Sequence, residues 1–584
     1  MATLMLIAVA YAPLAFAAVE PWAYLPLYAL FFLGAASAYA RGENAHAVPI
    51  YRNLLPAVLA AVVIGLLQSF TQAAINGPAH TLFTAWRPAT LNAVILWLFY
   101  AAVMYTAAKT IKTPAQLSRL LWTIFGVGVF VALMGTLQHT GDNTIVYGLR
   151  QVRGQAFGPF VNRDHGAFFL SMAGMCGLGL FFGGFRPLFR HQSHTTLFDL
   201  LAVQFLKLVM IAAIVAGIVK TGSRGGLHSF VSATVFIGFV AGGFLKSRAQ
   251  KIWTWLALLL LLAWYGLVLS KYRILMGLDG ENLVSSVTVR FSMYKSGWAM
   301  FRDFPFFGTG LGAVEHAFPY YAGPDLTSVT SNIVRHVHSD WLELFLQLGA
   351  VGGLIYLAGL FAALYGFYRA WLKCRSFTVK AVYGGALGAV IVGMLHSFVD
   401  FGLQMPANSL VFYLLLGALA SRPAVMGRGL TPHEEENDPE PSPPKRIYAN
   451  TAAVLAALLT LAAFPQLMAW QYDQRASGAE FSEELALRRE SLRWQPGPQA
   501  AFRLAAAGYN RAVKFRSEAP CQKFKAAQSA AWPFLRAAPV NYDLRRLERP
   551  LLLQLANCYN GPLVIISGGK PPASEPPTSG PSRP

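Results

Sequence analysis

The chain has 584 residues, of which 55% are hydrophobic and only 13% are charged. In soluble domains about a quarter of all residues are charged, so this composition excludes an ordinary soluble protein. The formal net charge is +20. The basic residues lie between long apolar stretches rather than together on one soluble surface, which argues against a nucleic-acid-binding protein.

Apolar stretches of membrane-spanning length recur along the chain, and a spanning helix needs roughly 20 apolar residues. We expect about thirteen such helices by this length rule. They are predicted at 2–19, 22–40, 54–75, 89–108, 119–139, 164–184, 199–219, 226–245, 252–270, 343–368, 380–400, 408–421 and 447–468. The predicted fold class is therefore all-α, a polytopic membrane bundle of about 12–13 transmembrane helices.

Lysine and arginine gather in alternate loops, and the positive-inside rule assigns those loops to the cytoplasm. The other loops are then periplasmic. They are 140–163, 220–225, 271–342, 401–407 and the residues after 468. We therefore expect a multi-pass protein of a bacterial inner membrane, with a cytoplasmic N-terminus and a periplasmic C-terminal domain.

Composition divides the chain into five predicted parts. They are a transmembrane core at 1–427, a disordered cytoplasmic linker at 428–446, a last transmembrane helix at 447–468, a periplasmic helical domain at 469–566 and a disordered tail at 567–584. The helical domain contains Cys521 and Cys558. Because disulfides persist in the oxidising periplasm, we expect these two cysteines to be bridged.

Chemically competent side chains fall in four segments, at 158–165, 221–226, 289–342 and 396–408, all predicted on the periplasmic face. These segments contain Arg163, Arg224, Arg290, Arg335, His336, His338, Asp340, His396 and Asp400. Guanidinium groups bind phosphate bidentately, and a histidine near neutral pKa can take a proton from a hydroxyl. Such a set suits a reaction in which a lipid-linked phosphate is the leaving group.

Each residue alone has a simpler interpretation. Arg224 could be a tight-turn residue, and His338 and Asp340 could only satisfy a helix terminus. His396 and Asp400 are four residues apart and could merely pair with each other. Gly308, the first glycine of G-T-G-L-G, is predicted in a flexible loop, because no strand precedes it as a nucleotide site requires.

The same segments resemble the O-antigen ligase and polymerase superfamily over roughly 120–421. The most specific part is H-S-D-W-L-E-L-F-L-Q-L-G-A-V-G from His338, with S-R-G-G from Ser223 and R-F-S-M-Y-K-S-G-W from Arg290. The resemblance implies a glycosyltransferase that takes a glycan from undecaprenyl pyrophosphate. It also implies an inverting transfer that needs no metal or other cofactor.

By motif position the resemblance implies that His338, Arg290 and Arg224 are catalytic. From their place on the same face, we expect Arg163, Arg335, Asp340, His396 and Asp400 to bind substrate. The implied partners are the lipid-linked donor, an acceptor glycan or lipid A-core, the lipid bilayer and other polysaccharide-assembly proteins.

Several functions remain open at this point. The segment H-S-F-V-D-F-G-L-Q-M-P-A-N, 396–408, resembles the polymerase branch, and the C-terminal domain departs from short ligases, so ligase and polymerase both stand. Protein O-oligosaccharyltransferase is a further alternative. A flippase for lipid-linked glycans is the rival transporter, although the helix centres are nearly free of charge. A third class of function is a structural factor that scaffolds a polysaccharide-assembly machine through its C-terminal domain.

Overall fold

The computed structural model describes residues 1–40, 51–73, 75, 80–138, 144–151, 155–185, 194–243, 247–275, 280–322, 326, 334–374, 376–421, 446–477, 479, 481–495, 503–504 and 507. The predicted tail, Cys521, Cys558 and all of the predicted linker except its last residue lie outside the described residues. The chain divides into two units, Met1–Gln471 and Tyr472–Pro584.

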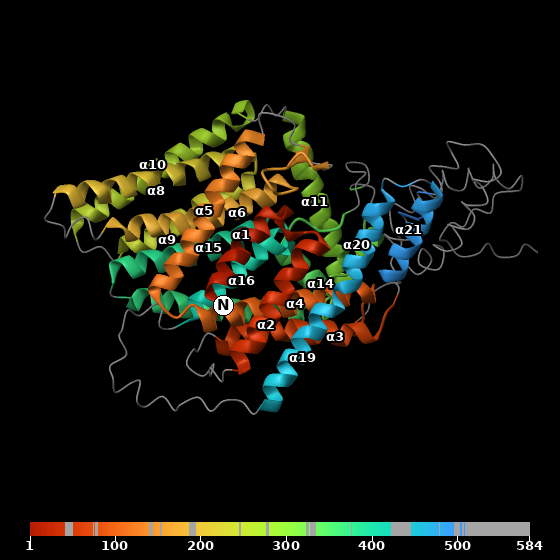
Figure 1. Ribbon diagram of the computed structural model, residues 1–584. Helices are drawn as coiled ribbons and strands as arrows, with labels where there is room; N and C mark the ends of the chain where they lie inside the picture. The colour runs from red at the N-terminus through yellow and green to blue at the C-terminus, as the bar shows by residue number, and fades with distance from the viewer. Residues whose placement is uncertain are drawn as a thin grey trace, which may run out of the picture. The chain divides into compact units, whose positions relative to one another are not determined.

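The larger unit is a bundle of α-helices (Figure 1). Its long helices are α1 (Ala2–Leu14), α2 (Pro21–Ala40), α3 (Tyr51–Phe70), α4 (Arg87–Thr110), α5 (Pro114–Gln138), α6 (Arg163–Gly183), α8 (His194–Lys220), α9 (Arg224–Gly243), α10 (Arg248–Leu275), α11 (Gly280–Asp303), α14 (Asp340–Lys373), α15 (Phe377–His396), α16 (Pro406–Ala420) and α19 (Arg446–Ala462). Next, α20 (Phe464–Ala476) runs across the boundary between the units, and α21 (Phe481–Trp494) belongs to the smaller one.

Short elements connect these helices. They are η1 (Phe16–Ala18), the antiparallel strands β1 (Ile145–Val146) and β2 (Arg150–Gln151), α12 (Val314–Ala317), η3 (Phe318–Tyr320) and η4 (Gly402–Gln404). The segment 271–342, expected as one long loop, thus contains α11 and α12.

Within the described residues, ten helices are long and apolar enough to cross a membrane. Three shorter apolar helices, Ala2–Leu14, Leu54–Phe70 and Pro406–Ala420, complete the series. Together they follow the predicted stretches in order, and the last one extends beyond the predicted 447–468 to Asn450–Ala476. The protein is therefore an all-α polytopic membrane bundle, as the sequence predicted.

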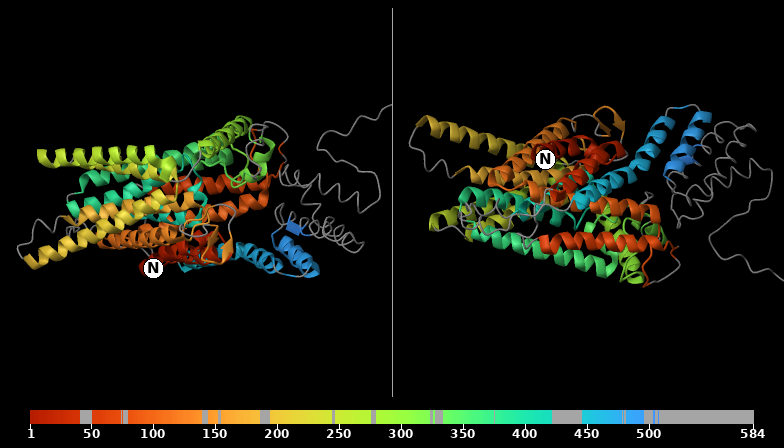
Figure 2. Two further views of the ribbon diagram at one scale, coloured as in Figure 1. Left: turned by 90° about the horizontal axis from the view of Figure 1, so that it is seen from above. Right: turned by 60° about the horizontal axis from the view of Figure 1, so that its bottom comes forward.

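Helix α6 is deeply buried, since 83% of its apolar 18-residue stretch lies inside the bundle. Figure 2 shows the bundle from two further sides. Helix α6 packs along α15 where two glycines face each other. A Cβ atom at Gly179 would lie 2.7 Å from the Cα atom of Gly385. Small residues of this kind let helix backbones approach closely in a membrane, where dispersion contacts rather than water release hold helices together.

Helix α14 is broken at Gly349, where φ is 64° and ψ is −170°. The residues just after α11 supply the missing hydrogen bonds. The amides of Ala350 and Val351 donate to the carbonyls of Pro305 (2.7 Å) and Phe306 (3.1 Å). Backbone polar groups at membrane depth must find protein partners, so this segment allows the break.

The loop that follows is also bound to α14. The amides of Thr309 and Gly310 donate to the carbonyls of Leu346 (2.9 Å) and Gln347 (3.2 Å). The buried Gln68 of α3 joins them, because its side chain accepts from the Leu311 amide at 2.9 Å and donates to the Gln347 carbonyl at 3.0 Å. The G-T-G-L-G segment is therefore held in place rather than flexible, which corrects the expectation from the sequence.

Candidate active site at one end of the bundle

Several helix ends meet around α6. The start of α9 approaches α6 so closely that a Cβ atom at Gly226 would lie 2.6 Å from Ala167 Cβ. The start of α16 reaches α6 through Asn408, whose Nδ2 donates to the His165 carbonyl at 3.2 Å. The amide of Asp340, the first residue of α14, donates to the carbonyl of Asp400 at 3.1 Å. Residues from four distant segments thus gather at one end of the bundle.

His338 and Asp400 form the central contact of this site. Nδ1 of His338 lies 3.2 Å from Oδ1 of Asp400, and the carboxylate is buried while the imidazole is partly exposed. Burial acts to raise the pKa of Asp400, but His165, His338 and His396 together outweigh it and the pKa is lowered. An ionised carboxylate on Nδ1–H makes Nε2 the basic nitrogen of the neutral ring.

The backbone of His338 is unusual, with φ at +52°. A residue other than glycine seldom adopts this left-handed region, and functional sites are where such strain collects. Tyr294 of α11 holds the strained residue, because its hydroxyl donates to the His338 carbonyl at 2.9 Å. The imidazole is therefore aimed by a fixed backbone rather than by its rotamer alone.

Arg290 lies on the same face of α11 as Tyr294, four residues earlier. Its Nη2 lies 3.7 Å from Oδ2 of Asp164 in the first turn of α6. Both side chains are partly exposed, at 29% and 21%. Arg290 thus stands at the rim beside the His338–Asp400 pair, with its guanidinium accessible to a ligand.

Arg224 is the first residue of α9. Its neighbour Gly225 lies against α15, since a Cβ atom there would be 3.3 Å from Nε2 of His396. The Asp400 carboxylate is 3.9 Å from the same nitrogen. The S-R-G-G glycines therefore allow the close approach that brings the Arg224 backbone beside the His396–Asp400 pair.

Asp340 accepts hydrogen bonds from three residues that follow α15. Its Oδ2 accepts hydrogen bonds from Ser397 Oγ (2.9 Å) and the Leu403 amide (3.0 Å), and its Oδ1 from Gln404 Nε2 (3.4 Å). These bonds fix the 397–404 segment that carries Asp400. Ser339 caps α14 by accepting from the Leu342 amide at 3.3 Å, so the cap is not Asp340.

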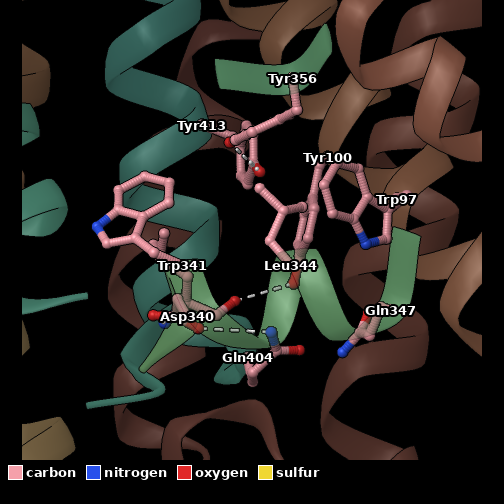
Figure 3. A pocket seen from close by; sticks show the side chains of 10 residues that line it. Trp97, Tyr100, Asp340, Trp341, Leu344, Gln347, Tyr356, Gln404 and Tyr413 are labelled. Atoms are coloured by element: carbon pink, nitrogen blue, oxygen red, sulfur yellow. Dashed lines mark hydrogen bonds between the residues drawn. The ribbon is translucent and has the colours of Figure 1, made fainter. Parts of the chain in front are cut away.

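Asp340 also lines a small pocket between α4, α14 and α16 (Figure 3). Asp340 and Gln404 lie at one end of it, and the hydrogen-bonded pair of Tyr356 and Tyr413 lies at the other. Tyr100 stacks on Tyr413 with ring centroids 4.4 Å apart. Half of the ten residues that line the pocket are aromatic, and the pocket extends from Asp340 into the bundle.

Two predicted arginines have other partners. Arg163 donates to the side chain of Gln155, and Arg335 lies 3.4 Å from Glu315 with 60% of its side chain exposed. The structure thus brings His338, His396 and Asp400 together, places Arg290 and Arg224 at their edge, and engages Arg163 and Arg335 elsewhere.

Sequence reasoning did not select Tyr294, His165 or Phe401. Phe401 touches three imidazoles, with ring centroids 4.4 Å from His336, 4.7 Å from His165 and 4.9 Å from His338. The spacing of four residues from Arg290 could have indicated Tyr294. No local pattern distinguishes Phe401 from the other phenylalanines of the bundle.

His336 forms a separate pair. Its Nδ1 lies 2.9 Å from Oε1 of the buried Glu343. Burial acts to lower the pKa of His336, but the charge and hydrogen bond of Glu343 outweigh it and the pKa is raised.

Two comparisons with known proteins bear on the chain. A search of curated proteins gives no match. The family model described as O-antigen ligase matches residues 208–357, a range that contains Arg224, Arg290 and His338. The segment 208–357 thus matches the O-antigen ligase family model, within a chain whose described part has ten helices able to cross a membrane.

Proposed function

We propose that the protein transfers a glycan from undecaprenyl pyrophosphate to an acceptor hydroxyl on the periplasmic face of the membrane. The observation that carries this proposal is the His338–Asp400 contact of 3.2 Å, with Arg290 at the same rim. A histidine held by a carboxylate is suited to general-base catalysis, and an accessible guanidinium is suited to a diphosphate. The O-antigen ligase domain supports membrane glycosyl transfer in general.

The proposed step is an inverting displacement. Nε2 of His338 takes the proton of the acceptor hydroxyl as its oxygen attacks the anomeric carbon of the donor glycan. The bond between that carbon and the pyrophosphate oxygen breaks, and undecaprenyl pyrophosphate leaves with the electron pair. Arg290 and Arg224 neutralise the charge that grows on the leaving oxygen, and preorganised charge of this kind is commonly worth a few kcal/mol.

Asp400 stabilises the imidazolium that forms on His338, because its pKa lies below the usual range and it stays ionised. Asp340 acts by fixing the segment 397–404 that carries Asp400. Arg163 and Arg335 would be available to the donor or acceptor glycan only if they leave Gln155 and Glu315.

The test uses a bacterial strain in which the gene for this protein is deleted and variants of the protein are expressed instead. His338→Ala and Arg290→Ala should lower transfer by roughly 10²–10⁴-fold while the protein remains in the membrane. Arg224→Lys should also be impaired, because an ammonium cannot reproduce a bidentate fork. Arg369→Ala, at the other end of α14 where Arg369 bonds Tyr365, is the matched control and should leave transfer intact. Normal transfer by His338→Ala would refute the general-base role.

The same strain distinguishes a ligase from a polymerase. Gels of surface polysaccharide should show lipid-linked polymer that is not attached to its acceptor if the protein is a ligase. They should show single repeats on the acceptor if it is a polymerase. Resemblance of 396–408 to the polymerase branch keeps the second outcome open. Loss of lipid-linked glycan from the periplasmic face altogether would instead indicate a flippase.

A further inference from the structure

The second oxygen of Asp400 faces two histidines that the step above does not use. Oδ2 lies 3.7 Å from Nε2 of His165 and 3.9 Å from Nε2 of His396. The exposed fractions of the side chains are 5% for His165 and 1% for both His396 and Asp400. Within the described part of the chain, Asp400 Oδ2 and His165 Nε2 are buried without a hydrogen-bond partner. Buried polar atoms almost always have one, so two facing atoms of this kind point to a pair.

His165 is fixed in place independently of this contact. Its carbonyl accepts from Asn408 Nδ2 at 3.2 Å, which ties the start of α6 to the start of α16. Its ring meets Phe401 edge-on at 4.7 Å, and the same Phe401 meets the His338 ring edge-on at 4.9 Å. His165 is therefore held against the same aromatic ring as the general base.

His396 is arranged differently. It is the last residue of α15, and its ring lies against Phe168 at a centroid distance of 4.8 Å. Among the described residues, the other nitrogen of its ring, Nδ1, is also buried without a hydrogen-bond partner. Of the two histidines, His165 has the shorter distance to Asp400 and shares Phe401 with His338.

We propose that His165 is a positioning residue for the transfer reaction: its Nε2–H donates to Asp400 Oδ2, so that Oδ1 is held on Nδ1 of His338. A shift of about 0.5 Å or slightly more closes the 3.7 Å separation to hydrogen-bond distance. The carboxylate would then be fixed at both oxygens while His338 gains its proton. At metal sites, losing the outer partner that orients a histidine commonly costs about 10–100-fold, and we expect an effect of that order here. The inference rests on the proposed function and deepens it.

Three variants test it with purified full-length protein. The donor is the undecaprenyl-pyrophosphate glycan pool extracted from membranes of the deletion strain. His165→Leu should lower kcat at least about tenfold with donor KM within about twofold of wild type. His165→Gln should recover most of that loss, because its side-chain amide can still donate. His336→Gln is the matched control, since His336 stacks on the same Phe401 but pairs with Glu343, and its kcat should stay near wild type.

A double-mutant cycle separates positioning from a general structural effect. In an Asp400→Asn background, His165→Leu should cost little further, because the carboxylate that it positions is already gone. An equal loss in both backgrounds would overturn the proposal, as would a kcat for His165→Leu within twofold of wild type. His165→Met, closer to histidine in bulk, replaces His165→Leu if that variant does not accumulate in the membrane.

The outcomes also separate this inference from the proposed function. If the wild-type protein releases no undecaprenyl pyrophosphate from the donor pool, the proposed function fails. If the wild type is active and His165→Leu matches it, only the role of His165 fails.

Discussion

His338 and Asp400 are 62 residues apart in the chain, yet their side chains are in contact. In the proposed mechanism, His338 depends on that contact for its tautomer, because Nδ1–H bound to the carboxylate leaves Nε2 to take the proton. The local sequence around each residue indicates neither the contact nor the tautomer. Motif spacing could identify His338 and the face on which Asp400 lies, but the partner relation came from the packing of α14 against the end of α15.

The first residue-level prediction concerns Asp400→Asn. The amide keeps the shape of the side chain but loses the charge that stabilises the imidazolium. We expect kcat to fall on the order of 10²-fold, within the range of general-base effects, while donor binding is retained. Initial-rate kinetics with purified protein measures both. A wild-type kcat for Asp400→Asn, with normal melting of the variant, would show that His338 does not depend on this carboxylate.

The second concerns His336 and pH. Its pKa is raised in the folded protein by Glu343 despite burial. A raised pKa means that the stabilisation is fully present below the unfolded value, about 6.5, and is lost as pH rises through the folded value. The melting temperature of wild type should therefore exceed that of His336→Gln by more at pH 6 than at pH 8.5. A difference that grows with pH would contradict the assignment.

At the level of elements, the helices were predictable because length and apolar content decide which segments can span a membrane. The break in α14 was not. Its sequence L-G-A-V-G-G reads as an ordinary glycine-rich helix, and the break depends on carbonyls at Pro305 and Phe306 that lie in a different segment. Likewise, no apolar periodicity distinguishes the end of α11 and the bound loop after it from a free loop.

Gly349→Ala tests whether the break is required. The backbone angles at Gly349 are almost restricted to glycine and cost about 1–3 kcal/mol for other residues. A Cβ atom there would also lie 2.2 Å from the carbonyl of Phe306. We expect a lower melting temperature and loss of transfer.

Gly126→Ala in α5 is the matched control for that substitution. A Cβ atom at Gly126 meets no atom of the described residues within 4 Å, so alanine should be neutral or slightly stabilising there. Equal melting temperatures for the two variants would show that α14 can run unbroken through Gly349.

At the scale of the whole molecule, the catalytic proposal depends on which side of the membrane receives the His338–Asp400 end of the bundle. The loops rich in lysine and arginine connect the opposite helix ends, which the positive-inside rule places in the cytoplasm. The sequence predicts this orientation from loop charge alone. It does not predict the contacts at the site, because those depend on which helices become neighbours.

Reporter fusions test the orientation directly. Alkaline phosphatase should be active after Gly148 and Ser477, and a fluorescent protein should be bright after Ser247 and Lys373. Gly148 lies in the β1–β2 turn that precedes α6, and Lys373 ends α14 on the far side from His338. A cytoplasmic Gly148 would place His338 in the cytoplasm as well, because α6 and α14 both begin at the site. Transfer to a periplasmic acceptor would then be impossible, even with every side-chain contact intact.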